Sequence, residues 1–182
     1  PEKFANWCEE RYTELGKRVY LTRRMDRAVP LTHYSFITTH SGIFKTIKDK
    51  TIQEEIKSII DKPFVIQDSK GKFDETHYFK MNKMLKMFEN NQVYVKRQHV
   101  LNQVSKYLVE QEMLPALCYV FSRKQLEKCA FEITTPLLEF DSKVPYTIQR
   151  ECEQIIRKLP NYQEYLHLPE YVNLVSLLEK GI

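Results

Sequence analysis

The stretch that decides the fold is "LPALCYVFSRKQLEKCAFEI", residues 114–133. Residues 116–121 form an uninterrupted apolar run between Pro115 and Ser122. A strand without polar alternation is typical of a parallel sheet that is covered by helices on both faces. Ser122 and Gln125 then form a capping box, so a helix is expected directly after the strand. The apolar face of that helix would carry Leu126, Cys129, Ala130 and Ile133.

Helical patterns flank this strand in the sequence. One helix is expected at about 99–113, and two more are expected near 148–159 and 171–178, where Gly181 would cap the last helix. Helices on both sides of a buried strand predict an α/β fold, here part of a doubly wound parallel sheet.

The candidate site lies where this strand meets its helix. In open α/β sheets, ligands bind beyond the carboxyl ends of the strands, which here means Phe121, Ser122 and Arg123. The free N–H groups of a helix N-terminus suit a phosphate, the Ser122 hydroxyl can donate a hydrogen bond, and Arg123 and Lys124 add cations. In the alternative interpretation, Ser122 caps only its own helix and Arg123 is solvated. The sequence leaves both open.

The first half of the chain predicts smaller elements. Residues 1–15 have a helical pattern that Gly16 ends, and "RVYL" (18–21) is typical of a short strand. We expect residues 31–39 and 43–47 to form a β-hairpin around Gly42. Downstream, we expect a helix from the capping box at 51–54 to Pro63, a strand at 64–67, and a turn at 68–72.

The letters D-E-x-H occur at Asp74, Glu75 and His77, as in the Walker B box of many helicases. That box must follow a buried strand and face a phosphate-binding loop. Here a polar turn precedes it, and no two glycines of the chain have the spacing of such a loop. Because a helical pattern follows, we predict that Asp74 is a helix N-cap and that Glu75 lies favourably near the positive end of the helix dipole.

The composition is that of an ordinary soluble chain. There are 182 residues, of which 42% are hydrophobic and 29% charged, with a net charge of +4 that permits nucleic-acid binding without requiring it. No apolar run reaches membrane-spanning length and no secretory signal is evident, so we expect an intracellular protein of the cytoplasm or nucleus. The spacing of the four cysteines and five histidines suggests no metal site, and free thiols are expected.

The stretch "LPALCYVFSRKQLEKCA" resembles motif IV of superfamily-2 DExH RNA helicases, most closely the superkiller-like, exosome-associated branch. "RRMDRAVPLTHYSF" resembles the R-P-V-P-L-x-H-Y linker of that branch, and "GIFKTIKDK" resembles its following G-L-Y strand. "VIQDSKGKFDETHYFK" is similar to a V-x-D-x-x-G-x-F stretch before motif IV. "PEKFANWC" and "LLEKGI" resemble the segments that follow the S-A-T motif and precede the next motif. Ala28 departs from the usual proline, and residues 131–165 are less family-like.

The resemblance implies an internal fragment of a helicase. Residues 1–29 would end the first RecA-like domain and carry the linker, residues 30–98 would form a connecting hairpin and helical segment, and residues 99–182 would begin the second RecA-like domain. The phosphate loop and working DExH box would precede this segment, and the arginine-finger motif would follow it.

The same resemblance implies a function. The complete protein would couple ATP hydrolysis to RNA unwinding or translocation, with ATP and Mg²⁺ as cofactors that no residue of this segment binds. The segment alone would hold no catalytic residue. Ser122 and Arg123 would contact the RNA backbone, with Phe121 packed beneath, and the partners would be RNA and the rest of the same chain. The cluster Arg23, Arg24 and Arg27 is better interpreted as a solvated linker. The alternative function is a non-catalytic α/β module that binds RNA or protein.

Overall fold

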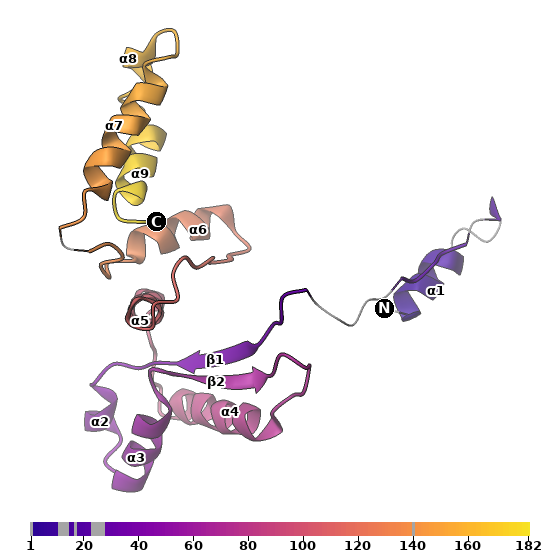
Figure 1. The fold of residues 1–182 in the computed structure, drawn as a ribbon. Coiled ribbons are helices and arrows are strands. Elements are labelled where there is room, and N and C mark those ends of the chain that lie inside the picture. The colour runs from indigo at the N-terminus through magenta and orange to yellow at the C-terminus, as the bar shows by residue number, and fades with distance from the viewer. Residues whose placement is uncertain (1, 11–14, 17, 23–27, 140) are drawn as a thin grey trace.

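The computed structural model describes residues 2–10, 15–16, 18–22, 28–139 and 141–182. It is an α/β structure with more helix than strand, and Figure 1 labels its elements in chain order. The elements are α1 (Glu2–Glu10), β1 (His33–Ile37), α2 (Ile43–Thr46), α3 (Lys50–Ile59), β2 (Lys62–Gln67), α4 (Glu75–Asn90), α5 (Arg97–Glu110), α6 (Arg123–Glu132), α7 (Val144–Ile156), α8 (Tyr162–Tyr165) and α9 (Pro169–Leu178).

The sheet is small. Strands β1 and β2 pair antiparallel, with Tyr34 opposite Val65 and Phe36 opposite Pro63. These four residues lie on one face because side chains alternate along a strand. On that face, the ring of Phe36 packs against Tyr107 of α5, with 5.7 Å between the ring centroids. The predicted α/β class is confirmed, whereas the described residues form no parallel sheet.

The hydrophobic core lies between the other face of this sheet and the helices α2, α3 and α4 (Figure 1). Three isoleucines, Ile43, Ile56 and Ile59, are fully buried in it. The buried core residues are Ile37, Ile43, Ile47, Ile56, Ile59, Met81, Met84 and Phe88. We refer to residues 33–93, which contain this core, as the β1–α4 body.

The hairpin predicted from residues 31–39 and 43–47 is wrong in its second strand. Residues Ile43–Thr46 are the helix α2, and β1 pairs instead with β2. Helix formation places Ile43 and Ile47, one turn apart, in the same core, where they are 0% and 6% exposed. A strand would have placed these residues on one face too, so the short apolar run did not distinguish the two structures.

The helix after α2 begins earlier than predicted. The N-cap of α3 is Asp49, whose Oδ1 accepts hydrogen bonds from the N–H groups of Thr51 at 2.8 Å and Ile52 at 3.3 Å. The predicted capping box at 51–54 is therefore wrong, although the helix itself is confirmed. A carboxylate accepts both hydrogen bonds, which leaves Thr51 inside the first turn.

The strand at 64–67 is confirmed as part of β2, and the turn after it is confirmed. The carboxylate of Asp68 accepts hydrogen bonds from the N–H groups of Lys70 and Lys72, both at 2.9 Å. Gly71 has φ of +86°, a conformation that favours glycine. In contrast, residues 18–22 form no regular structure, so the strand predicted at 18–21 is wrong. Val19 and Tyr20 are exposed there and meet no partner strand among the described residues.

The helices predicted in the second half are confirmed as α5, α6, α7 and α9, and Gly181, with φ of +84°, follows the end of α9. Helix α5 packs against α6, and α7 packs against α9. Among the described residues of this half, the one apolar residue that is buried is Cys129 of α6. No helix in the described part of the chain is long and apolar enough to cross a lipid bilayer.

Candidate nucleic-acid site at the start of α6

The candidate residues Ser122 and Arg123 lie where the segment at 114–121 enters α6. Ser122 occupies the N-cap position with extended backbone, φ −118° and ψ 122°. Its carbonyl oxygen accepts the first helical hydrogen bond, from the Leu126 N–H at 2.8 Å. Its hydroxyl makes no cap hydrogen bond, so the predicted capping box with Gln125 is wrong. The Ser122 side chain is therefore available to a ligand.

The residues before Ser122 are not the buried strand that the sequence predicts. Residues 116–120 have no regular structure, and the segment is open to solvent. Leu117 is 81% exposed, Tyr119 is 86% exposed and Phe121 is fully exposed. The expectation that Phe121 packs beneath the site is therefore wrong for this chain. A strand of this kind needs hydrogen-bonding neighbours on its edges, and none of the described residues pairs with it.

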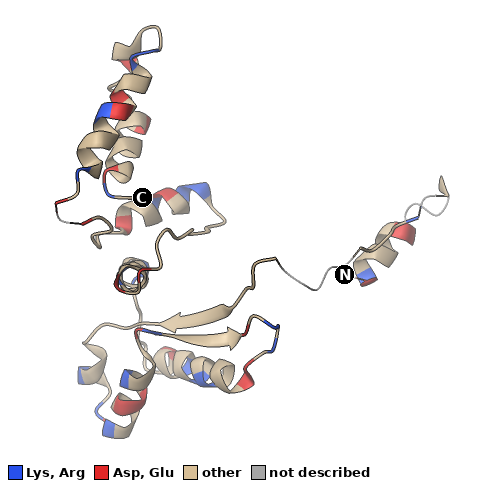
Figure 2. Ribbon diagram, in the orientation of Figure 1, with Lys and Arg blue, Asp and Glu red and all other residues tan. Residues whose placement is uncertain are grey.

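The first turn of α6 is positively charged. Arg123 and Lys124 are both exposed, and the blue end of α6 in Figure 2 corresponds to them. No ion pair joins either side chain to another residue that the structure describes. Two free cations, a free hydroxyl and the unpaired N–H groups of a helix N-terminus therefore lie together, which is a combination suited to a phosphate group.

A bidentate ion pair fixes α6 against α5. The guanidinium of Arg97 donates hydrogen bonds to both carboxylate oxygens of Glu132, at 2.9 and 2.7 Å, and to Oε1 of Gln125 at 2.6 Å. The hydrogen bonds from Arg97 lower the pKa of Glu132, and those to Glu132 raise the pKa of Arg97. Because the pKa of Glu132 is lowered on folding, the pair stabilises the fold at neutral pH, and this contribution is lost as the pH falls through the folded pKa of Glu132.

A second polar contact holds the chain just beyond α6. The side-chain oxygen of Asn102 accepts hydrogen bonds from the N–H groups of Thr134 and Thr135, both at 2.8 Å. The two threonine hydroxyls donate to the same oxygen, at 3.1 and 2.9 Å. The side-chain amide donates in turn to the carbonyl oxygen of Glu132 at 2.8 Å. We refer to Asn102, Glu132, Thr134 and Thr135 as the Asn102 clamp.

Neither contact could be found in the sequence. Arg97 and Glu132 are 35 residues apart, and Asn102 lies 30 to 33 residues from its partners across α6. Asn and Thr at helix surfaces are common, and no short-range spacing connects them. These contacts depend on how α5 and α6 are placed relative to each other, which no local pattern in the sequence gives.

The D-E-x-H letters lie at the start of α4, and the prediction that Asp74 is a helix N-cap is confirmed. Asp74 is the N-cap of α4, and its Oδ1 accepts a hydrogen bond from the His77 N–H at 2.9 Å. Glu75 lies in the first turn of α4, where the helix dipole favours a negative charge. His77 is turned inward, with its Nδ1 2.9 Å from the carbonyl oxygen of Val65. These residues support the fold of α4.

Replacement of Asp74 by alanine is therefore expected to destabilise the β1–α4 body by about 1 kcal/mol, through loss of the cap. Urea unfolding of both chains measures the difference. Glu75→Ala serves as the comparison, because it removes only a dipole interaction and should cost less, about 0.3–1 kcal/mol. An ATP hydrolysis activity that either substitution abolished would contradict this assignment.

The remaining candidates from the sequence are the arginine cluster and the possible metal ligands. Arg23, Arg24 and Arg27 lie outside the described residues. The four cysteines are free thiols, of which Cys118 is exposed in the segment before α6. The described residues hold no cluster of three or more His, Cys, Asp or Glu side chains that could bind a metal ion.

The comparisons with known proteins identify no family for this chain. The sequence matches no protein-family model. Searches of curated proteins and of solved structures found no match.

Proposed function

We propose that this chain is a segment of an ATP-dependent RNA helicase of the DExH class, superkiller-like branch, whose ATP-binding motifs lie in other parts of the protein. The observation that carries the proposal is the exposed apolar surface of residues 99–182. The finer fold, a RecA-like doubly wound parallel sheet, and the boundaries 1–29, 30–98 and 99–182 belong to the same proposal.

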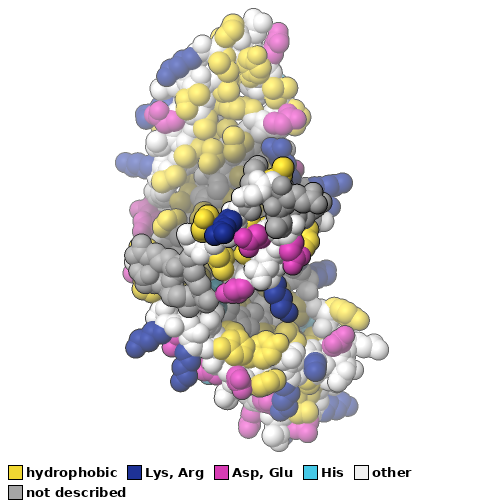
Figure 3. Space-filling view, turned by 90° about the vertical axis from the view of Figure 1, so that its right-hand side faces the viewer, with side chains coloured by type: hydrophobic (Ala, Val, Ile, Leu, Met, Phe, Trp, Pro, Cys, Tyr) yellow, Lys and Arg dark blue, Asp and Glu magenta, His cyan; other side chains and the backbone are white. Residues whose placement is uncertain are grey.

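The uncovered surface has two parts. One is the segment at 114–121, in which Leu117, Tyr119 and Phe121 are all exposed to solvent. The other covers α7 and α9, where Ile155 is 60% and Leu174 57% exposed. Figure 3 shows apolar side chains spread over the upper part of the molecule, where Figure 1 places these helices.

Monomeric soluble domains rarely leave so much apolar surface exposed. A parallel sheet supplied by the rest of a longer chain would pair with residues 116–121 on both edges and cover the apolar sides of the helices. The order of the linker-like and motif IV-like stretches supports the same conclusion independently, because both resemble one helicase branch. The proposal thus accounts for an apolar segment that is unpaired and exposed here, although its sequence predicts a buried strand.

In this proposal, Ser122 and Arg123 bind the RNA backbone. Arg123 offers hydrogen bonds in a fork that matches a phosphate group, and Ser122 adds a hydroxyl at the helix N-terminus. Such contacts position the strand and carry no base specificity. ATP and Mg²⁺ would bind elsewhere in the complete protein, and closure of its domains around ATP would move the strand past this point.

The test uses the complete protein. Its ATP hydrolysis should be stimulated by RNA, and Arg123→Ala should weaken RNA binding for every sequence while lowering the slope of log affinity against log salt by about 0.7. Arg150→Ala is the matched control, because it removes an exposed arginine from α7, where it pairs with Glu151. We expect this control to leave RNA affinity unchanged.

Two outcomes would contradict the proposal. ATP hydrolysis that RNA does not stimulate would argue against a helicase. RNA binding by a complete protein that contains no phosphate-binding loop would instead favour the alternative, a non-catalytic α/β binding module.

A further inference from the structure

We propose that the outer face of α4 binds a short single-stranded nucleic acid, with bases stacked on exposed aromatic rings and the backbone held by lysine and asparagine side chains. This inference rests on the proposed function, since it assigns a second contact for the same RNA in a separate part of the chain. We refer to the residues involved as the α4 strip: Phe73, Tyr78, Phe79, Asn82, Lys86 and Asn90.

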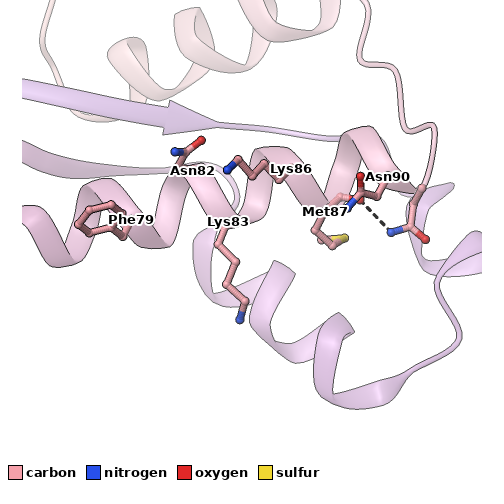
Figure 4. A pocket seen from close by; sticks show the side chains of 7 residues that line it. Phe79, Asn82, Lys83, Lys86, Met87 and Asn90 are labelled. Carbon is pink, nitrogen blue, oxygen red and sulfur yellow. Dashed lines mark hydrogen bonds between the residues drawn. The ribbon is translucent and has the colours of Figure 1, made fainter.

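The strip follows a hollow of about 420 Å³ on α4, and a second hollow of about 300 Å³ lies against α7 and α9. In Figure 4, Phe79 lies at one end of this hollow and Asn90 at the other. Asn82 and Lys86 line one edge, and Lys83 on the opposite edge points towards α3. These residues are on the side of α4 opposite Met81, Met84 and Phe88, which are buried, so the core does not need them.

An aromatic row extends the hollow at its Phe79 end. The rings of Tyr78 and Phe79 meet edge to face with centroids 5.5 Å apart, and Phe73 lies 5.4 Å from Tyr78. All three rings are exposed: Phe73 46%, Tyr78 43% and Phe79 62%. Three adjoining exposed aromatic rings on a soluble domain are costly to leave in water, and flat rings of this kind are the platforms on which unpaired bases stack.

The charges along the hollow favour a polyanion. Its lining contains two lysines and three asparagines and no carboxylate. Lys83 is neutralised by Glu55 of α3, with 3.0 Å between Nζ and Oε1. Lys86 is exposed and has no ion-pair partner among the described residues. The carboxylates of Asp74 and Glu75 lie in the chain between Phe73 and Tyr78, and Glu89 precedes Asn90, so the attractive region is confined to the turns from Phe79 to Lys86.

The dimensions suit a single strand. Phe79 and Asn90 are eleven residues apart on a helix that rises 1.5 Å per residue, which gives a strip of about 16 Å. At about 3.4 Å per stacked nucleotide, it accommodates roughly five nucleotides. A duplex is excluded because its bases are already stacked and paired and cannot reach the rings of Tyr78 and Phe79. The asparagines, which donate and accept hydrogen bonds, can contact both phosphates and base edges.

The experiment measures binding of a fluorescein-labelled hexauridylate to the 182-residue chain by fluorescence anisotropy, without ATP. Phe79→Ala should weaken binding about five- to a hundredfold, through loss of stacking. Lys86→Gln should lower the salt slope by about 0.7. The matched controls are Tyr146→Ala, an aromatic residue that is 70% exposed on α7, and Lys48→Gln, an exposed lysine outside α4. Neither control should change the affinity.

A second variant reports stacking directly. Phe79→Trp places an indole on the strip, and its fluorescence should be quenched by the hexauridylate, whereas that of Tyr146→Trp should not be. The inference is overturned if the oligonucleotide does not bind, if Phe79→Ala and Tyr146→Ala behave alike, or if Phe79→Ala changes only the self-association of the chain in sedimentation, which would indicate a protein-binding surface.

The two proposals fail separately. RNA-stimulated ATP hydrolysis by the complete protein, without hexauridylate binding to this chain, would overturn the strip and leave the helicase. Binding that depends on Phe79 and Lys86, without RNA-stimulated hydrolysis, would support the strip and overturn the helicase.

Discussion

Replacement of Ile56 by alanine is expected to lower the free energy of unfolding of the β1–α4 body by about 2–5 kcal/mol. Ile56 is fully buried between the other fully buried isoleucines of the core, Ile43 and Ile59. The substitution deletes three buried side-chain carbon atoms and leaves a cavity. The lost packing contacts and the cavity both destabilise the fold. The body is small, so this loss is a large part of the 5–15 kcal/mol or so that stabilises a typical domain.

Hydrogen exchange of peptides from α3 and β2 measures this effect within the body itself. A cooperative body should lose protection in both elements by the same free energy. The matched control is Ile155→Ala, the same substitution at a position on α7 that is 60% exposed, where we expect a change within about 0.5 kcal/mol. Similar effects at the two positions would show that Ile56 is not part of a packed core.

The β1–α4 body shows how far the sequence alone could go. The strand at 64–67, the turn after it and the Asp74 cap of α4 were all predicted, because each depends on residues within about five positions of one another. The second strand of the hairpin was wrong for the opposite reason. Residues 43–47 have a pattern that suits a helix or a strand, and the choice was made by a core to which distant residues of α3 and α4 contribute.

The segment at 116–121 shows a different limit. Its apolar run predicts a buried strand, but the structure has no strand there and leaves Leu117 and Tyr119 exposed. The structure leaves the segment unpaired because the described part of this chain contributes no strand beside it. A short sequence shows that a segment is apolar, but whether the segment is buried depends on residues distant from it in the chain.

For the candidate site, the sequence predicted a position in the chain, whereas nucleic-acid binding at that position stays a prediction. Ser122 and Arg123 were selected from the pattern of a strand followed by a helix, and both do lie at the start of α6. The capping role of Ser122 could not be excluded from the sequence, because a hydroxyl at an N-cap position either binds its own helix or remains free. The Asn102 clamp was missed, since its contacts join residues from two helices and a loop.

Replacement of Asn102 by alanine is expected to weaken the packing of α6 on α5 by about 1–3 kcal/mol. One side chain accepts hydrogen bonds from the backbone N–H groups and hydroxyls of Thr134 and Thr135, and it also donates to the Glu132 carbonyl. Alanine leaves the N–H groups of Thr134 and Thr135 without this acceptor. Because α6 carries Ser122 and Arg123, we also expect the RNA affinity of the proposed site to fall.

Hydrogen exchange of peptides from α6, compared with those from α4, measures the local effect. Asn173→Ala is the matched control, since Asn173 is exposed on α9. Asn102→Asp keeps the acceptor oxygens and loses the donor, so its effect should be intermediate at neutral pH. A decrease in protection of α4 as large as that of α6 would contradict a local clamp.

Acidic pH distinguishes the stabilisation by Asn102 from that by the neighbouring ion pair. The stabilisation by Arg97 depends on ionised Glu132, whose pKa is lowered on folding, so it is present at neutral pH and lost as the pH falls through that folded pKa. Asn102 does not titrate, so the difference between the wild-type chain and Asn102→Ala should persist at acidic pH. The effect of Arg97→Gln should become smaller, because the hydrogen bond to Gln125 then remains without the ion pair. If both effects vanished together, the ion pair and not the asparagine would hold α6 in place.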